Sequence, residues 1–192
     1  MAMHKVEEKV NSINVDYKEI YKEDLINHVV SRIKTPDSII KKMKRKNYEL
    51  TYQNLIENIN DIAGVRIICP FKTNVFKVVD IIREFDDIRV IKEKDYITTP
   101  KKTGYSSYHM IVEVPVELEE NEVYAKVEIQ IRTMAMDFWA TLEHELKYKS
   151  TGKITPKVSR DLVMYAKIIN KIDNRLLKIH DKRNNQKFEI SD

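Results

Sequence analysis

Two carboxylates stand in segments whose composition is otherwise typical of buried strands. Asp61 directly precedes the apolar run 62–69, and Glu128 lies in the alternating segment 126–132. Because side chains alternate between the two faces of a strand, Glu128 belongs to a polar face. Two carboxylates from neighbouring strands can hold a Mg²⁺ ion that takes its other ligands from water and phosphates. A solvent-exposed sheet face would show the same alternation, so the pattern alone leaves both interpretations open.

A dense group of basic side chains precedes Asp61. Residues 32–46 contain seven Lys or Arg and one acid, and a helix is predicted to start at Pro36 within them. Helical spacing brings several of these side chains near one face, together with a serine: Ser38, Lys41, Lys42 and Arg45. Such a face can neutralise a polyphosphate. A solvated helix face or a nucleic-acid surface has the same composition, so charge alone does not choose between them.

The segment 101–109, Lys-Lys-Thr-Gly-Tyr-Ser-Ser-Tyr-His, places basic and aromatic side chains around one glycine. Tyr105, next to Gly104, can present its ring as a stacking platform for a base. Lys101 can meet phosphates, and His109 can donate a hydrogen bond. An ordinary hairpin with aromatic strand residues would explain the same pattern.

A sheet is needed to position these residues. Short β-branched or alternating runs predict strands at 62–69, 88–95, 108–114 and 123–132. Apolar periodicity predicts helices at 16–34, 36–46, 52–58, 73–85 and 133–149, and a long one from Pro156 onward, after a break at Gly152. The last three strands have no helix between them, which favours antiparallel pairing. We therefore expect an α+β fold, with a mixed, largely antiparallel sheet flanked by helices.

The C-terminal segment carries a second apolar pattern. Its apolar residues are spaced alternately four and three apart: Val158, Leu162, Tyr165, Ile169, Ile172, Leu176 and Ile179. This is the a/d spacing of a coiled coil, which slightly favours a subunit interface. An amphipathic helix packed on its own domain is the alternative.

The composition excludes several classes of protein. The chain has 192 residues, a net charge of +4, three glycines and one cysteine, Cys69. One cysteine allows no intramolecular disulfide or Cys-x-x-Cys zinc site, and three glycines cannot build a Walker or dinucleotide-binding loop. No apolar run approaches the about 18 residues of a membrane span, and the N-terminus lacks a signal-peptide core. These features predict a soluble, cytoplasmic protein.

Three motifs, taken in order, resemble the synthetase domain of the RelA/SpoT family. They are Asp-Ile-Ala-Gly-Val-Arg-Ile at 61–67, Lys-Asp-Tyr-Ile at 94–97 followed by 101–109, and Glu-Ile-Gln-Ile-Arg-Thr at 128–133. The segments 136–140 and 143–144 resemble the small, stand-alone alarmone synthetases of the RelQ type. The resemblance covers about residues 30–150 and implies a nucleotidyltransferase-like fold without an N-terminal hydrolase domain. We expect a synthetase domain at 1–155 and an oligomerisation helix and tail at 156–192.

The resemblance implies transfer of pyrophosphate from ATP to the 3′-hydroxyl of GTP or GDP, which gives (p)ppGpp and AMP. Mg²⁺ is the implied cofactor, with Asp61 as its principal ligand and Glu128 as second ligand, general base or both. The residues implied on the ATP side are Arg32, Lys34, Ser38, Lys42, Arg45 and Arg66, of which Arg32 and Arg66 sandwich the adenine. Those implied on the acceptor side are Tyr105, stacked on guanine, with Lys94, Lys101, His109 and Gln130; His144 is a secondary candidate.

The resemblance also implies a homotetramer and single-stranded RNA as a further ligand. A catalytically silent, oligomeric RNA- or nucleotide-binding module of the same fold is the main alternative. The intact pair of Asp61 and Glu128 weighs against it, because a silent binder needs no such pair. An enzyme that transfers a nucleoside monophosphate is a third hypothesis.

Overall fold

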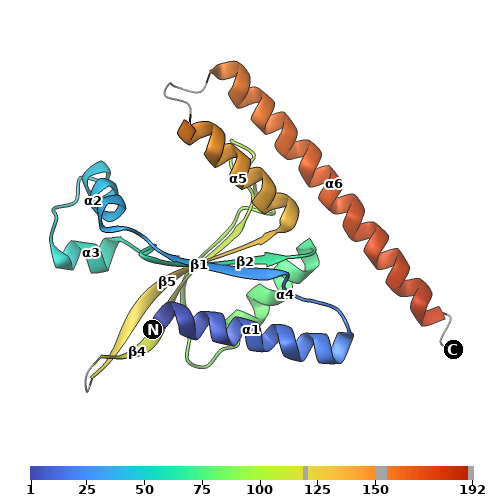
Figure 1. Cartoon of the computed structure of the whole chain (residues 1–192), viewed down its shortest axis with the longest axis horizontal. Coiled ribbons are helices and arrows are strands. Elements are labelled where there is room, and N and C mark those ends of the chain that lie inside the picture. Colours follow the sequence, from blue (N-terminus) through green and yellow to red (C-terminus); the bar gives the residue numbers. More distant parts are fainter. Residues whose placement is uncertain (119–120, 150–154, 190–192) are drawn as a thin grey trace.

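Five strands form one mixed sheet at the centre of the molecule (Figure 1). The computed structural model describes residues 1–118, 121–149 and 155–189. The strands are β1 (His28–Ile33), β2 (Ala63–Cys69), β3 (Arg89–Asp95), β4 (Tyr108–Leu118) and β5 (Asn121–Thr133). Their order in the sheet is β1-β2-β5-β4-β3; β2 and β5 are parallel, and the other neighbouring pairs are antiparallel. The predicted α+β fold with a largely antiparallel sheet is confirmed.

Helices cover the two faces of the sheet unequally. They are α1 (Ala2–Tyr21), α2 (Pro36–Arg45), α3 (Tyr52–Asn58), α4 (Lys72–Arg83), α5 (Met134–Lys149) and α6 (Pro156–Glu189). α1 and α4 pack on one face, where the apolar rows of β2, β4 and β5 are fully buried. α5 lies on the other side, and α6 runs along α5 (Figure 1). None of the helices in the described ranges is long and apolar enough to cross a membrane.

The predicted helix at 16–34 is wrong. α1 begins at Ala2 and ends at Tyr21, where Lys22 adopts the left-handed conformation with φ 56°. After the turn, the Asn27 N–H donates to the Ile68 carbonyl at 2.7 Å, and β1 then pairs antiparallel with β2. The open edge of β2 supplies ladder hydrogen bonds that a helix over these residues would forgo. Arg32 and Lys34 therefore lie at the end of an edge strand, not on a helix.

The apolar pattern of α6 is divided between two environments. Leu162 and Ile169 pack toward α5, in the cluster that contains Trp139. A second row of α6, with one apolar residue every seven positions, is 38–63% exposed: Val158, Tyr165, Ile172 and Ile179. The helix thus contacts its own domain with one side and leaves a second apolar row uncovered. Gly152, the predicted break before α6, lies outside the described residues.

Candidate active site

Polar side chains cross the sheet in two rows on the face away from α1 and α4. Residues paired across neighbouring strands share a face, so the register defines the rows. One row consists of Lys94, His109, Gln130, Arg66 and Val30. The other consists of Lys92, Ile111, Glu128, Gly64 and Arg32. The register therefore brings residues predicted for ATP and residues predicted for the acceptor nucleotide onto one surface.

The two predicted carboxylates lie together. Asp61 directly precedes β2, and Glu128 is paired with Gly64 on the neighbouring β5. Both line the same two cavities, one of about 520 Å³ and one of about 160 Å³. A place where a ligand can touch both carboxylates is thus part of the fold.

Asp61 is held by two lysines. The Lys34 N–H donates to the Ile62 carbonyl at 2.8 Å, which keeps Lys34 beside Asp61, and its ammonium group hydrogen-bonds Oδ2. Lys42, on α2, places Nζ 2.7 Å from Oδ1. Burial raises the pKa of Asp61, but the hydrogen bond from Lys34, the close contact with Lys42 and the charges of both lysines outweigh burial and lower that pKa overall. Asp61 is therefore ionised at neutral pH.

Glu128 is held by donors from its own sheet. Gln130 donates from Nε2 to Oε2 at 3.0 Å, and His109 Nδ1 lies 3.3 Å from Oε1. Burial raises the pKa of Glu128, and so does the charge of Asp61. The contact with His109 and the hydrogen bond from Gln130 outweigh both and lower the pKa below its ordinary value. Glu128 is thus an ionised carboxylate that can accept a proton.

The donor set fits Mg²⁺ bound together with phosphates. Mg²⁺ prefers oxygen ligands and is usually held by one or two carboxylates, with water and phosphates completing its shell. Oδ1 of Asp61 is buried, and its contact with Lys42 is an ion pair without hydrogen-bond geometry. Within the described ranges, no group of three or more His, Cys, Asp or Glu could hold a metal ion. Among the described residues, Asp61 and Glu128 are thus the carboxylates that could hold such an ion, and water or phosphates would complete its shell.

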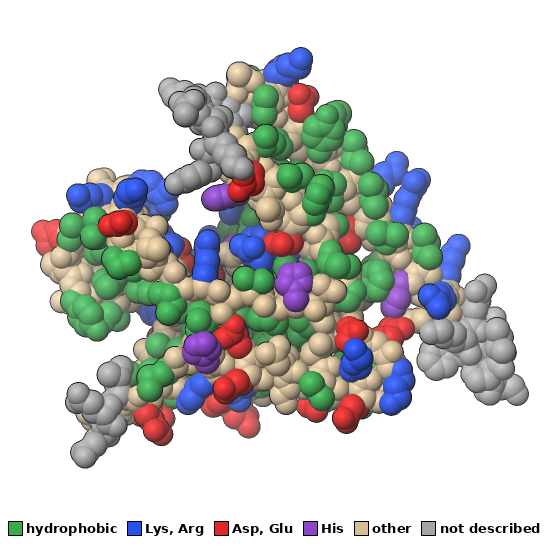
Figure 2. Space-filling model, in the orientation of Figure 1, with side chains coloured by type: hydrophobic (Ala, Val, Ile, Leu, Met, Phe, Trp, Pro, Cys, Tyr) green, Lys and Arg blue, Asp and Glu red, His purple; other side chains and the backbone are tan. Residues whose placement is uncertain are grey.

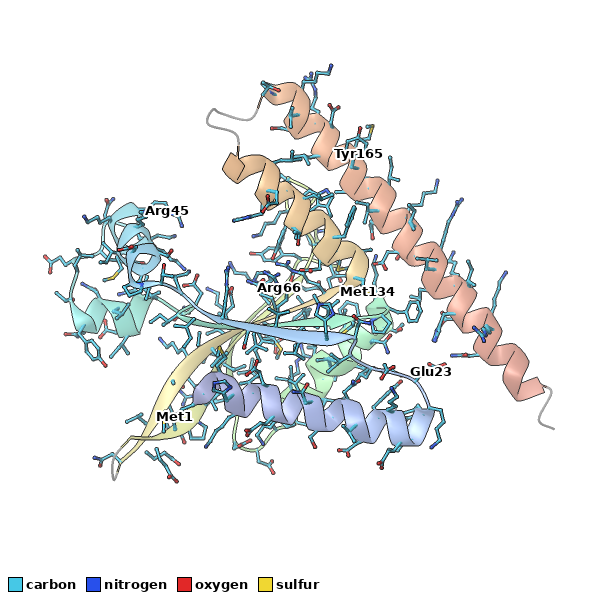
Figure 3. The ribbon with its side chains drawn as sticks, in the orientation of Figure 1. Met1, Glu23, Arg45, Arg66, Met134 and Tyr165 are labelled. Atoms are coloured by element: carbon cyan, nitrogen blue, oxygen red, sulfur yellow. The ribbon has the colours of Figure 1, made fainter. Side chains whose placement is uncertain are left out.

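A third cavity, of about 480 Å³, adjoins Asp61 on the side of α2. It is lined by Lys34, Ser38, Lys41, Lys42, Arg45, Asp61 and His144. Figure 2 shows the Lys and Arg side chains over α2 at the border of a hollow that faces α5. Arg32 and Arg66 line the 160 Å³ cavity, and Figure 3 shows Arg45 at α2 and Arg66 at the centre of the sheet. All six residues predicted for ATP therefore border cavities that contain Asp61.

The residues predicted for the acceptor do not all reach the same place. Lys94, Lys101 and His109 line the 520 Å³ cavity with Glu128, whereas Gln130 lines the smaller one. Tyr105 does not line either cavity. Two cations contact its ring: Lys101 Nζ lies 4.5 Å from the ring centroid, and Arg132 Cζ lies 5.1 Å from it.

Sequence reasoning did not single out three residues of this surface. The ring of Tyr96 lines the 520 Å³ cavity, with Lys101 Nζ 4.5 Å from its centroid. Asp137, on α5, accepts from Arg132 at 3.0 Å and lies 3.4 Å from Arg66. Burial and the charge of Arg132 lower the pKa of Arg66, and Asp137 opposes them. A signal for each was present, since Tyr96 follows Lys94 closely, Arg132 lies in the same strand as Glu128 and Asp137 lies in the segment 136–140. The contact between Arg132 and Asp137 is known only from the structure.

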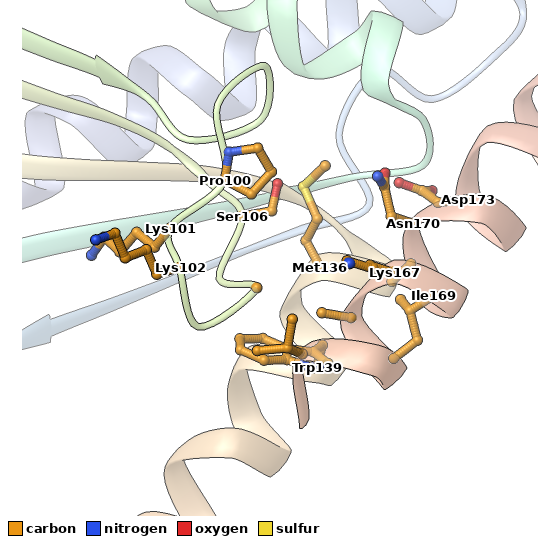
Figure 4. Close-up of a pocket in the computed structure, with 14 residues that line it drawn as sticks. Pro100, Lys101, Lys102, Ser106, Met136, Trp139, Lys167, Ile169, Asn170 and Asp173 are labelled. Atoms are coloured by element: carbon orange, nitrogen blue, oxygen red, sulfur yellow. The ribbon is translucent and has the colours of Figure 1, made fainter. Parts of the chain in front are cut away.

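An apolar pocket of about 250 Å³ lies behind the segment 100–106, between α5 and α6 (Figure 4). Its wall includes Trp139 of α5 and Ile169 of α6. Gly104 has φ +89°, and a Cβ atom there would lie 2.4 Å from Cβ of Ala166 on α6. The pocket is lined by neither Asp61 nor Glu128. We regard it as part of the seam, the contact surface where the segment 100–106 packs against α6.

Comparisons with known proteins agree with this arrangement. The family model described as the region found in RelA / SpoT proteins matches residues 31–153. The chain is 42% identical over 178 residues to GTP pyrophosphokinase YwaC of Bacillus subtilis (strain 168), which covers 93% of this chain and 85% of that protein. The crystal structure of small alarmone synthetase 1 from Bacillus subtilis bound to its product pppGpp matches with a TM-score of 0.87 and 35% identity, over 94% of this chain and 92% of that one. The same synthetase bound to AMPCPP matches with a TM-score of 0.80 and 32% identity, over 96% and 92%.

Proposed function

The chain belongs to the RelA/SpoT family, and from that premise we propose how its site carries out the reaction of a small alarmone synthetase. The protein is an enzyme of (p)ppGpp synthesis that transfers pyrophosphate from ATP to the 3′-hydroxyl of GTP or GDP, with release of AMP. The observation that carries the proposal is the convergence of Asp61 and Glu128 on the same cavities, next to the basic face of α2.

ATP lies, in this proposal, along the hollow between α2 and the sheet. Lys34, Lys42 and Arg45 meet its phosphates, and Ser38 contributes a hydrogen bond at the first turn of α2. Arg32 and Arg66 hold the adenine, because a planar guanidinium stacks on a flat base better than an ammonium group does. Phosphoryl transfer depends mainly on positioning and charge neutralisation, and these cations supply both.

The acceptor lies in the 520 Å³ cavity, with its 3′-hydroxyl beside Glu128. Glu128 takes the proton of that hydroxyl as the oxygen attacks the β-phosphorus of ATP, and AMP leaves with the bridging oxygen. A sugar hydroxyl is a poor nucleophile at neutral pH, so an ionised carboxylate at this place has a direct role. Lys94, Lys101 and His109 surround the acceptor, and Tyr105 or Tyr96 offers a ring to the guanine.

Asp61 would hold Mg²⁺, with Glu128 as a second carboxylate at the same place. Such an ion, when bound, neutralises charge on the transferred phosphates. The related structures support nucleotide binding of both kinds, because the relative was solved with pppGpp and with AMPCPP. As ATP and GTP are its substrates, we place the enzyme in the cytoplasm.

The proposal is tested with ATP that carries a label on its β-phosphorus, incubated with the protein, Mg²⁺ and either GTP or GDP. We expect the label in pppGpp or ppGpp and one AMP for each product formed. Release of the label as free pyrophosphate, with no label in the guanosine nucleotide, would instead show transfer of the nucleoside monophosphate. Absence of any product from folded protein, together with RNA binding that weakens steeply with salt, would show the silent binding module.

Gly104→Ala should weaken acceptor binding. An alanine is strained at positive φ, and its Cβ would collide with Ala166, so segment 101–105 must shift. Such substitutions cost more than about 1 kcal/mol, so we expect KM for GTP to rise about fivefold or more while KM for ATP stays unchanged. Steady-state kinetics with each substrate varied in turn measure this. Adding Ala166→Gly should restore part of the loss, because it removes the collision but not the strain; equal KM values for Gly104→Ala and wild type would contradict the role of this seam.

We propose that the uncovered row of α6 joins subunits, in a homotetramer. The row repeats every seven residues along the part of α6 that its own domain leaves exposed. Ile172→Glu should therefore reduce the mass measured by light scattering to that of a smaller assembly. Lys171→Glu, which changes charge at a neighbouring exposed position, is the matched control and should leave the mass unchanged. A wild-type mass of one chain would contradict the proposal.

A further inference from the structure

The guanidinium of Arg132 is buried beneath the proposed acceptor site, with 4% of the residue exposed. Its Nε donates to Ser107 Oγ at 3.2 Å and its Nη1 to Asp137 Oδ1 at 3.0 Å. Nη2 donates twice, to Tyr105 Oη at 2.6 Å and to Gln130 Oε1 at 2.8 Å. The last two contacts matter for the chemistry, because each partner leads on to Glu128.

The first branch runs through Gln130. Arginine can only donate hydrogen bonds, so the group of Gln130 that faces it must be the amide oxygen. The amide NH₂ is then turned toward Glu128, where Nε2 donates to Oε2 at 3.0 Å. Arg132 thus fixes the orientation of the Gln130 amide, so that its NH₂ group faces Glu128.

The second branch runs through Tyr105 and His109. The Tyr105 oxygen accepts from Arg132, and its own proton is then free for His109 Nε2, 2.8 Å away. A neutral imidazole that accepts at Nε2 carries its proton on Nδ1. Nδ1 lies 3.3 Å from Glu128 Oε1 and donates to it. The two branches therefore end on the two different oxygens of one carboxylate.

We propose that Arg132 is the positioning residue of the catalytic base: it fixes the amide of Gln130 and the tautomer of His109, so that both donate to Glu128. This inference rests on the proposed function, in which Glu128 takes the proton of the acceptor. Arg132 itself does not line the cavities that contain Glu128. A lysine cannot replace it, because Nε and Nη1 hold the guanidinium in this place through Ser107 and Asp137, and a single ammonium nitrogen cannot reach those two partners as well.

Tyr105→Phe tests the second branch, since it removes one hydroxyl and keeps the ring. We expect kcat to fall about 10- to 100-fold, the usual effect of losing a partner that orients an active group, with KM for ATP unchanged. Gln130→Leu should lower kcat in the same way through the first branch. Arg132→Lys interrupts both branches and should therefore lower kcat more than Tyr105→Phe or Gln130→Leu does. Arg89→Gln, in an exposed ion pair on β3, is the control and should keep wild-type kcat.

A spectroscopic measurement separates positioning from a merely structural role. In protein labelled with ¹⁵N-histidine, the imidazole shifts of His109, assigned with His109→Gln, report which nitrogen of the neutral ring carries the proton. We expect it on Nδ1 in the wild type and a loss of that preference in Tyr105→Phe. A proton on Nε2 in the wild type, or wild-type kcat in Tyr105→Phe and Gln130→Leu, would overturn the inference. If instead wild-type protein formed no product, the proposed function itself would fail, which these variants do not test.

Discussion

Glu128→Gln should lower kcat about 10²- to 10⁴-fold, the range that a positioned general base contributes. Glutamine keeps the size and the hydrogen-bonding reach of the side chain but cannot accept the proton of the 3′-hydroxyl. Binding of ATP and of GTP, measured by calorimetry, should stay near the wild-type values. Glu113→Gln, on β4 in an ion pair with Arg89, is the matched control and should leave turnover unchanged.

The pH dependence of kcat/KM gives an independent view of the same residue. Burial and the charge of Asp61 raise the pKa of Glu128. The contacts with His109 and Gln130 lower that pKa by more than burial and Asp61 raise it. Because the net shift is downward, the base remains ionised through neutral pH, and activity should fall only in the acid range. Near-normal turnover of Glu128→Gln would remove Glu128 from the role of base.

Asp61→Asn should lower activity by two to three orders of magnitude, or about 3–4 kcal/mol of transition-state stabilisation. The substitution removes the negative charge that would hold Mg²⁺ and leaves Lys34 and Lys42 without their shared partner. The Mg²⁺ concentration for half-maximal rate should therefore rise. Asp37→Asn, at the exposed first turn of α2, is the control for the loss of one carboxylate and should behave as wild type.

The same magnesium titration applied to Glu128→Gln separates the two roles given to that residue. If the Mg²⁺ concentration for half-maximal rate is unchanged, Glu128 acts as base alone. If that concentration rises, Glu128 is a metal ligand as well. Full activity of Asp61→Asn at wild-type Mg²⁺ concentrations would contradict the assignment of Asp61.

Sequence patterns predicted the strands that carry the site because the apolar pattern of each strand is visible in its own residues. The alternation around Glu128 and the β-branched run after Asp61 have a period of two over enough residues to exclude a helix. β1 was missed because the residues after the apolar pair Leu25 and Ile26 lack a clear alternation of apolar and polar side chains, and they were assigned to the predicted helix at 16–34. Its conformation depends on pairing with β2, whose paired residues lie 30 to 40 positions later in the chain. A short edge strand of this kind is decided by its partner and not by its own composition.

The surroundings of Glu128 could be predicted only in part. Gln130 and His109 were named as separate residues of the acceptor site, but their link through Arg132 depends on contacts between residues as far as 27 positions apart. For Tyr105, the sequence showed an aromatic ring beside glycine and not that its hydroxyl is held by a buried guanidinium. The heptad spacing of α6 slightly favoured a subunit interface over packing on its own domain. The structure shows that one side of the helix is already occupied by α5.

The most direct test is a crystal structure of the Glu128→Gln variant with Mg²⁺, GTP and an ATP analogue that cannot be cleaved. Our account predicts adenine between the guanidinium groups of Arg32 and Arg66, and the acceptor 3′-hydroxyl in contact with the side chain at position 128. It would be contradicted if the acceptor occupied the apolar pocket behind Gly104, or if its 3′-hydroxyl lay away from residues 61 and 128.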